Sequence, residues 1–360
     1  MLNRNALFHI FYYQEISVIL KFGEKYKNYH GDIGVQRVIM KYTYSALVLA
    51  LIVLTVLLVN LFVSFNNKAD TFVPQTEPAY HFVIITRDNS DPFWTKFKNG
   101  ATEAGAQNNI LVEFVDISHK DAALTADAVE RAILSDVDGI ALQPYDVEKT
   151  SAALKKARDS GISALTFEND VFYIPEIPTV GSTSYEIGYQ AGEMAAEASD
   201  GKAKIAVLAN DPGVQDSKQY NNIKMQGLLE AISKYPEMSV EQMYTLDTKM
   251  FEVDKLTTSI ITEKPEIDLI VCSDSENTPG VAQVIIDSVK VGNVKIIGYG
   301  AMPKTIEYIG GGVIYGTITP DSYNIGYNTV NQLAEMCGGK QISEFLNTDI
   351  YTFTSGNLEK

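Results

Sequence analysis

The stretch HFVIITRDNSDPFWTKFKNGATEAGAQNNILVEFVD, residues 81–116, holds two apolar runs separated by a segment of helical period. The runs at 81–87 and 110–116 have the length of buried strands, and the segment at 93–108 opens beside Asp91 and Pro92, which suit a helix start. Strand, helix and strand at this spacing predict a β-α-β unit with two parallel strands.

The same alternation continues along the chain and restarts once. After the first unit we expect strands at 137–143 and 162–168, with helices at 121–134 and 147–160. After the stretch 177–184 the pattern begins again, with strands expected at 204–209, 240–246, 268–273, 294–300 and 313–319 and a last helix at 322–338. The fold class predicted is therefore α/β, with two doubly wound parallel-sheet lobes joined by a hinge.

The domain boundaries follow from this restart. We assign residues 80–183 and about 320–345 to the N-terminal lobe, and residues 184–319 with the C-terminal tail to the C-terminal lobe. We expect the chain to cross between the lobes near 181–184, 298–300 and 319–321.

A long apolar run precedes the lobes. Residues 44–65, YSALVLALIVLTVLLVNLFVSF, carry no charge and reach the length of about 20 residues that a helix needs to cross a bilayer. Lys41 and Arg37 precede the run, so the positive-inside rule predicts an extracytoplasmic ectodomain on a single-pass signal anchor, with cleavage after the span as the alternative. Residues 1–43 would be a cytoplasmic segment, or upstream sequence before a true start at Met40, and residues 66–79 a linker.

Composition excludes several classes of function. The chain has 45 acidic against 29 basic residues and a formal net charge of −16, which disfavours nucleic acid as a partner. The two cysteines, Cys272 and Cys337, have no metal-type spacing and are expected to be buried thiols, with a disulfide as the alternative. We find no phosphate loop, no HExxH and no nucleophile–base pair, so we predict a binding protein rather than an enzyme, with no cofactor and no metal.

Polar and aromatic residues follow the predicted strands, where open parallel sheets bind ligands. In the first lobe these include Asp91, Phe93 and Trp94, then Gln143, then Glu168 and Asn169; in the second they include Asp274, Ser275, Glu276 and Tyr299. Carboxylates and amides suit sugar hydroxyls, and aromatic rings suit the apolar faces of a sugar ring. Phe93 and Trp94 could instead pack the helix onto the sheet.

Several motifs in a consistent order resemble the ribose and galactose class of periplasmic sugar-binding proteins that serve ABC importers. They are DPFWTKFKNGATEAG (91–105), DGIALQP (138–144), ALTFEND (164–170), VGSTSYEIGYQAGEMAA (180–196), SDSENTPGVAQVI (273–285) and IIGYG (296–300). The resemblance implies ring contacts from Phe93 and Trp94 and an aromatic wall from Tyr299. It further implies hydroxyl contacts from Asp91, Gln143, Glu168, Asn169, Ser182 and Asp274.

The chain departs from that class at three positions. Lys224 stands where the resemblance implies a ligand-binding arginine, and a lysine cannot form the bidentate fork. Gly300 replaces an aspartate of the pentose binders, and Pro320 replaces a ligand amide. The resemblance thus implies the sugar-binding family and leaves the sugar open.

We therefore expect a membrane-anchored, monomeric ectodomain that captures a sugar or sugar-like molecule for an ABC permease. The alternative is a ligand sensor that signals to a membrane histidine kinase or another receptor. Both would close around the ligand, and the partner would recognise the closed form.

Overall fold

The structure is a computed structural model that describes residues 42–43, 46, 48–51, 53–58, 77–87, 91–117, 122–144, 147–168, 174, 176–211, 217–247 and 250–358. The chain divides into two compact units, Met1–Val73 and Pro74–Lys360. The expected cytoplasmic segment lies almost wholly outside the described residues, as does most of the expected linker.

In the first unit the described residues between positions 42 and 58 are helical. Their large apolar side chains are 41–66% exposed, at Val48, Leu49, Leu51, Val53, Leu54, Val56, Leu57 and Leu58. Within the described part of the chain, no helix combines the length and the apolar character needed to cross a membrane. The predicted span at 44–65 includes many residues outside that part, so it stays a prediction.

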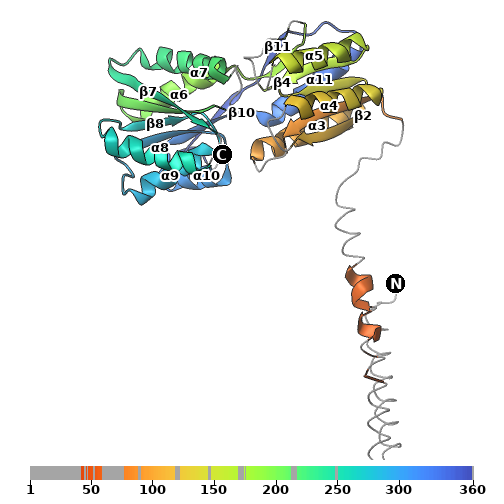
Figure 1. The fold of residues 1–360 in the computed structure, drawn as a ribbon, viewed down its shortest axis with the longest axis horizontal. Helices are drawn as coiled ribbons and strands as arrows, with labels where there is room; N and C mark the ends of the chain where they lie inside the picture. The colour runs from red at the N-terminus through yellow and green to blue at the C-terminus, as the bar shows by residue number, and fades with distance from the viewer. Residues whose placement is uncertain are drawn as a thin grey trace, which may run out of the picture. The chain divides into compact units, whose positions relative to one another are not determined.

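The first lobe is built on a six-stranded sheet that is parallel throughout (Figure 1). Its order is β11-β5-β4-β3-β1-β2, from β1 (Tyr80–Arg87), β2 (Ile110–Ile117), β3 (Gly139–Leu142), β4 (Ser163–Phe167), β5 (Thr179–Gly181) and β11 (Phe345–Asn347). The helices of this lobe are α3 (Pro92–Asn108), α4 (Ala122–Leu134), α5 (Val147–Asp159) and α11 (Ser322–Cys337).

Alternation along β1 explains why helices cover both faces of this sheet. Phe82 and Ile84 join the core beneath α3 and α11, whereas Val83 and Ile85 join the core beneath α4 and α5. Successive side chains of a strand point to opposite faces, so a continuous apolar run buries both.

The second lobe repeats this arrangement with one antiparallel strand at its edge. Its order is β12-β10-β9-β8-β6-β7, from β6 (Lys202–Asp211), β7 (Glu237–Asp247), β8 (Leu269–Cys272), β9 (Lys295–Tyr299), β10 (Gly316–Pro320) and β12 (Ile350–Thr354). The helices α6 (Ser184–Ala198) and α7 (Ser217–Ile232) cover one face. The other face is covered by α8 (Met250–Glu263), α9 (Asn277–Asp287) and α10 (Pro303–Gly310).

The prediction of two α/β parallel-sheet lobes is confirmed. The sequence analysis did not predict β5, β11 and β12 as strands. β5 and β11 have only three residues each, too few to give a period of two. Both cysteines are free, and Cys337 is half-buried rather than buried as expected.

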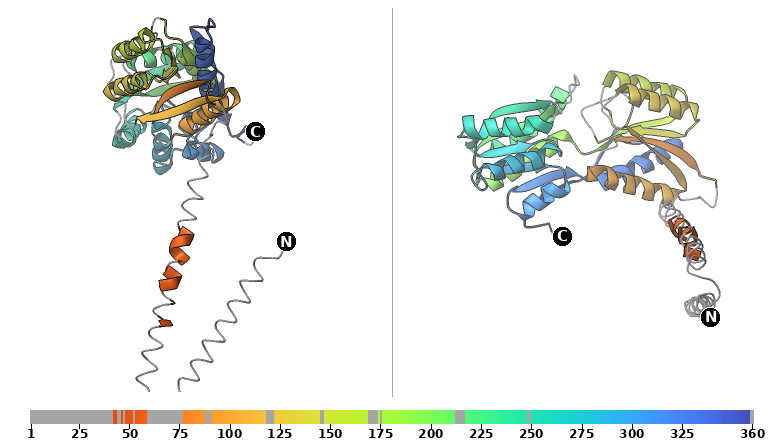
Figure 2. Two further views of the ribbon diagram at one scale, coloured as in Figure 1. Left: turned by 90° about the vertical axis from the view of Figure 1, so that its right-hand side faces the viewer. Right: turned by 60° about the horizontal axis from the view of Figure 1, so that its bottom comes forward.

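Within the described residues, three segments connect the lobes (Figure 2). β5 leads into α6, β10 leads into α11 through Asp321, and β11 leads into β12 through residues 348–349. The first two lie within the predicted segments 181–184 and 319–321. The predicted crossing at 298–300 is wrong, because β9 leads into α10, which packs on α9 and β12 of the same lobe.

The helix that follows each of the first two crossings begins with nearly the same sequence. α6 starts SYEIGY (184–189) and α11 starts SYNIGY (322–327). A Cβ at Gly326 would lie 2.0 Å from the Phe97 carbonyl oxygen of α3, and one at Gly188 would lie 1.8 Å from the Lys224 carbonyl oxygen of α7. In both lobes a glycine lets the helix after the crossing touch the backbone of its neighbour.

We expect Gly326→Ala to lower the free energy of unfolding by about 1–3 kcal/mol, because the added methyl group must push two helix backbones apart. Urea unfolding of the purified protein measures this change. Gly310→Ala is the matched control, since a Cβ there would meet only Leu358 Cδ1 at 3.8 Å. Equal stability of the two variants would contradict the close contact.

Candidate binding site at the carboxyl ends of the sheets

Asp91 fixes the start of α3 just after β1. Its Oδ1 accepts a hydrogen bond from the Phe93 backbone N–H at 2.9 Å, and Pro92 occupies the first helical position. Phe93 is half-buried. The cap therefore holds the Phe93 ring and the Asp91 carboxylate together at the carboxyl end of the first sheet.

Trp94 lies mostly in the core of the first lobe. Its side chain is 5% exposed and packs edge-on against Phe93 and Phe167, with ring centroids 5.1 and 6.2 Å away. This packing is the alternative role considered for Trp94 from the sequence. Its contact with a ligand stays a prediction, limited to the small part of the ring that is accessible.

Gln143 and Glu168 meet at the ends of two neighbouring strands, β3 and β4. The Gln143 side-chain amide donates a hydrogen bond to Glu168 Oε2. Glu168 has a left-handed backbone with φ of +72°, and its N–H donates to the Val180 carbonyl oxygen at 2.8 Å. A non-glycine residue with positive φ is uncommon and often marks a functional position. Asn169, which the sequence places beside this pair, lies outside the described residues.

Ser182 lies within the connection between the lobes. It is 1% exposed, and its hydroxyl is 3.0 Å from both the carbonyl oxygen and Oγ1 of Thr348. These contacts tie the first crossing segment to the third. The expected ligand contact of Ser182 is not tested by them and stays a prediction.

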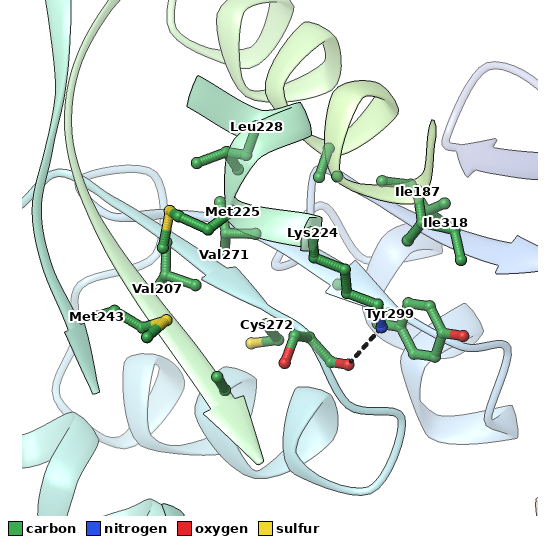
Figure 3. Close-up of a pocket in the computed structure, with 15 residues that line it drawn as sticks. Ile187, Val207, Lys224, Met225, Leu228, Met243, Val271, Cys272, Tyr299 and Ile318 are labelled. Carbon is green, nitrogen blue, oxygen red and sulfur yellow. Dashed lines mark hydrogen bonds between the residues drawn. The ribbon is translucent and has the colours of Figure 1, made fainter. Parts of the chain in front are cut away.

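Lys224 and Tyr299 form a pair in the second lobe (Figure 3). Lys224 is 7% exposed, its Nζ lies 4.2 Å from the centroid of the Tyr299 ring, and it is 3.5 Å from the Ser273 carbonyl oxygen. A cation held over an aromatic face is attracted by the negative electrostatic potential of the ring. The sequence pointed to both residues but not to their contact.

Lys224 and Tyr299 line a mainly apolar cavity. Its lining includes Val207, Met225, Leu228 and Val271, and its volume is about 30 Å³. That volume accommodates about one water molecule. The cavity is therefore too small for a sugar. Burial raises the pKa of the lining thiol, Cys272, to about 12, so this side chain is a neutral thiol.

Asp274 organises the turn between β8 and α9. Its Oδ1 accepts hydrogen bonds from the backbone N–H groups of Glu276 and Asn277 at 2.9 and 3.2 Å. Thr278 donates its hydroxyl to the Asp274 carbonyl oxygen at 2.8 Å. The turn is thus fixed by hydrogen bonds at both its start and its end.

Ser275, the next residue in this turn, reaches the other lobe. Its hydroxyl donates a 2.6 Å hydrogen bond to Asp91 Oδ2. The sequence analysis named Ser275 only among the residues after the strands and did not select it for the site. Its one available signal was its position directly after Asp274.

Gly300 occupies the position where the resemblance implied an aspartate. Its φ is +78°, and a Cβ there would lie 2.3 Å from the Ser275 Cβ. A side chain at position 300 is therefore disfavoured by both backbone conformation and space. Pro320, the other departure, pairs with Ile350 in the antiparallel edge ladder.

The described residues contain no group of three or more His, Cys, Asp or Glu side chains arranged to hold a metal ion. The candidate site residues that the structure describes are instead mainly carboxylates, one amide and aromatic rings, and they come from both lobes.

We expect Lys224→Met and Tyr299→Leu to show a coupling energy of about 0.5–2 kcal/mol in a double-mutant cycle of urea unfolding, because each removes one half of a buried cation–π pair. Lys304 and Tyr308, whose Nζ-to-centroid distance is 4.8 Å and whose lysine side chain is 50% exposed, form the control pair. Coupling no larger than that of the exposed pair would contradict a significant Lys224–Tyr299 interaction.

Comparison with known proteins places this chain in a family. The family described as periplasmic binding protein domain matches residues 82–341. The chain is 19% identical to the D-allose-binding periplasmic protein of Escherichia coli (strain K12) over 268 residues, which cover 69% of this chain and 81% of that protein.

Solved structures show the same fold. A glucose-galactose binding protein from Geobacillus stearothermophilus superposes with a TM-score of 0.71 at 22% identity, covering 78% of this chain and 99% of that one. A solute binding protein from Bacillus halodurans with bound myo-inositol gives a TM-score of 0.69 at 20% identity, covering 79% and 98%. These three proteins are named as binding proteins, in agreement with the prediction that this chain is not an enzyme. The resemblance to the ribose and galactose class is confirmed, and the chain belongs to the family of periplasmic binding proteins.

Proposed function

We propose that this protein captures a sugar or sugar-like small molecule between its two lobes, outside the cytoplasm, and presents it to an ABC importer. The observation that carries the proposal is the contact between Ser275 and Asp91, which brings the carboxyl-end turns of the two sheets to one place. Ligands of open parallel sheets bind at those ends. The names of the related proteins support a sugar as the ligand class.

The side chains at these ends have the chemistry that a polyol needs. Carboxylates and amides of Asp91, Gln143 and Glu168 can accept hydrogen bonds from hydroxyl groups, and the Phe93 ring can cover an apolar sugar face. We propose the following ligand-contacting set: Asp91, Phe93, Trp94, Gln143, Glu168, Asn169, Ser182, Lys224, Asp274 and Tyr299. Ser275 is not in this set.

Ligand binding is proposed to favour a closed arrangement of the lobes. The crossings beside Ser182, Asp321 and Thr348 are the segments that would absorb the rotation. A permease that binds the closed form better than the open one would then select the loaded protein. The names of the related proteins do not favour the sensor alternative.

We further propose that residues 44–65 anchor the protein in the membrane with the lobes on the outer side. The support is the uncharged apolar sequence and the exposure of apolar side chains on the described helical residues between 48 and 58. Such side chains are unfavourable in water and favourable in hydrocarbon.

We expect a saturable change of Trp94 fluorescence, with a raised melting temperature, on titration with one class among pentoses, hexoses, inositols, amino sugars and nucleosides. Trp94 is the only tryptophan and contacts Phe93 in the proposed set, so a change in its emission arises at or near the proposed site. Binding to the native state alone raises the melting temperature. A folded, ligand-free protein that responds to none of these compounds would contradict sugar capture.

We expect Phe93→Ala to weaken binding of the ligand so identified by about 1–3 kcal/mol, because the sugar loses one aromatic face. Isothermal titration measures the change. Phe114→Ala is the matched control, since Phe114 is a partly buried aromatic on the edge strand β2 of the same lobe. Equal affinities of the two variants would remove Phe93 from the proposed set.

We expect the full chain to remain in the membrane fraction after an alkaline carbonate wash, and a variant lacking residues 44–65 to become soluble. The physical reason is the transfer of about twenty apolar residues from water to hydrocarbon. Quantitative blotting of the washed pellet and supernatant measures the distribution. Full-length protein found in the supernatant would contradict the anchor.

A further inference from the structure

The contact between Ser275 and Asp91 joins two lobes that the crossing segments also connect. Asp91 caps α3 in the first lobe, and Ser275 lies in the turn that precedes α9 in the second. The two residues are 184 positions apart in the sequence. The bond runs directly from one side chain to the other, so it needs no third group between the lobes.

Each partner is held in place by its own lobe. Asp91 Oδ1 accepts from the Phe93 N–H, and Oδ2 accepts from the Ser275 hydroxyl. On the other side, Asp274 fixes the turn, and Ser275 is 8% exposed. Because the Asp91 carboxylate and the backbone of the Ser275 turn are each fixed within their own lobe, only the small serine side chain loses freedom when the lobes meet.

Gly300 is part of the same arrangement. The Ser275 Cβ occupies the space that a side chain at position 300 would need, because a Cβ on that glycine would lie only 2.3 Å away. The Gly300 backbone is fixed in turn, since its N–H donates to the Ile318 carbonyl oxygen at 2.8 Å and its carbonyl oxygen accepts from Thr317 Oγ1 at 2.7 Å. The serine thus rests on a rigid strand end.

The geometry points to Ser275 as a positioning residue that acts as an interlobe latch. Its hydroxyl holds the Asp91 carboxylate of the opposite lobe. This bond stabilises, before any ligand binds, a joined arrangement of the lobes in which Ser275 and Asp91 are in contact. A hydroxyl that donates to a carboxylate at 2.6 Å forms a charge-assisted bond, stronger than a bond between neutral groups. A carboxylate can accept several hydrogen bonds at once, and Asp91 accepts those of the Phe93 N–H and the Ser275 hydroxyl on different oxygen atoms.

The latch has a consequence for ligand affinity. The apparent affinity of a ligand that needs the joined arrangement equals its intrinsic affinity multiplied by the fraction of protein that has this arrangement. Ser275 raises the joined fraction without contacting the ligand. The affinity consequence rests on the proposed function, whereas the ligand-free equilibrium does not.

The test measures the distance between lobes in the full-length protein, in detergent and without ligand. Spin labels are placed at Leu134→Cys in the first lobe and Val289→Cys in the second, where the native side chains are 86% and 85% exposed. A Cys337→Ser background removes the half-buried thiol, while Cys272 is buried. Pulsed electron resonance then gives the distribution of label distances.

We expect two distance populations in the parent protein and a fall of about tenfold in the ratio of joined to separated forms in Ser275→Ala, the effect typical of losing one hydrogen bond to a charged group. Asp91→Asn, which keeps a good helix cap but removes the charge, should give an intermediate fall. Ser288→Ala, the same substitution at the other end of α9, is the control and should leave the ratio unchanged.

An unchanged distribution in Ser275→Ala would overturn the latch, and so would a parent protein that shows the separated form alone. A sugar identified by titration should bind Ser275→Ala more weakly by the same factor as the fall in the joined fraction, which is at most about tenfold when the ratio falls tenfold. If no sugar binds, the proposed function fails while the ligand-free distances still decide whether the latch exists.

Discussion

Hydrogen bonds among the three crossing segments hold the two lobes in register. The Asp321 N–H donates to the Asp349 carbonyl oxygen at 2.9 Å, and the Thr348 N–H donates to the Gly181 carbonyl oxygen at 2.8 Å. Asp321 is 4% exposed, and its carboxylate accepts from the Asn324 N–H and from the Tyr351 hydroxyl at 3.0 and 2.7 Å. The bond to Asp321 raises the pKa of Tyr351, because it stabilises the protonated phenol. A buried carboxylate without these partners would be strongly unfavourable.

The same local sequence serves both lobes at this junction. After each of the first two crossings, the S-Y-x-I-G-Y sequence begins a helix that touches its neighbour through a glycine. In each lobe two helix backbones are therefore in direct contact immediately after a crossing. The tyrosines of the two motifs are stacked in pairs, and a hydrogen bond to Glu103 raises the pKa of Tyr323 to about 12. The Tyr323 phenol therefore stays a protonated donor at neutral pH.

The departures from the ribose and galactose class are linked in space. Gly300 leaves room for Ser275, and Ser275 contacts the Asp91 carboxylate. Lys224, buried over Tyr299, has its charge compensated by an aromatic face and a carbonyl oxygen. The contacts around Gly300 and Lys224 therefore differ from those that the resemblance implied for the pentose binders.

The layered architecture could be predicted from residue order alone. The same order placed the candidate site residues at the carboxyl ends of the parallel strands. Apolar runs such as 81–87 identify strands buried on both faces, and the β-α-β order makes them parallel, because only a crossover connection joins parallel neighbours. The cap at Asp91 was equally readable, since Asp followed by Pro is a local signal. Which distant groups meet could not be predicted in this way. Residue type and spacing do not specify how segments far apart in the chain pack. Four features depend on that packing: the Ser275–Asp91 bond, the burial of Trp94, the role of Ser182 in the connection and the crossing at Thr348.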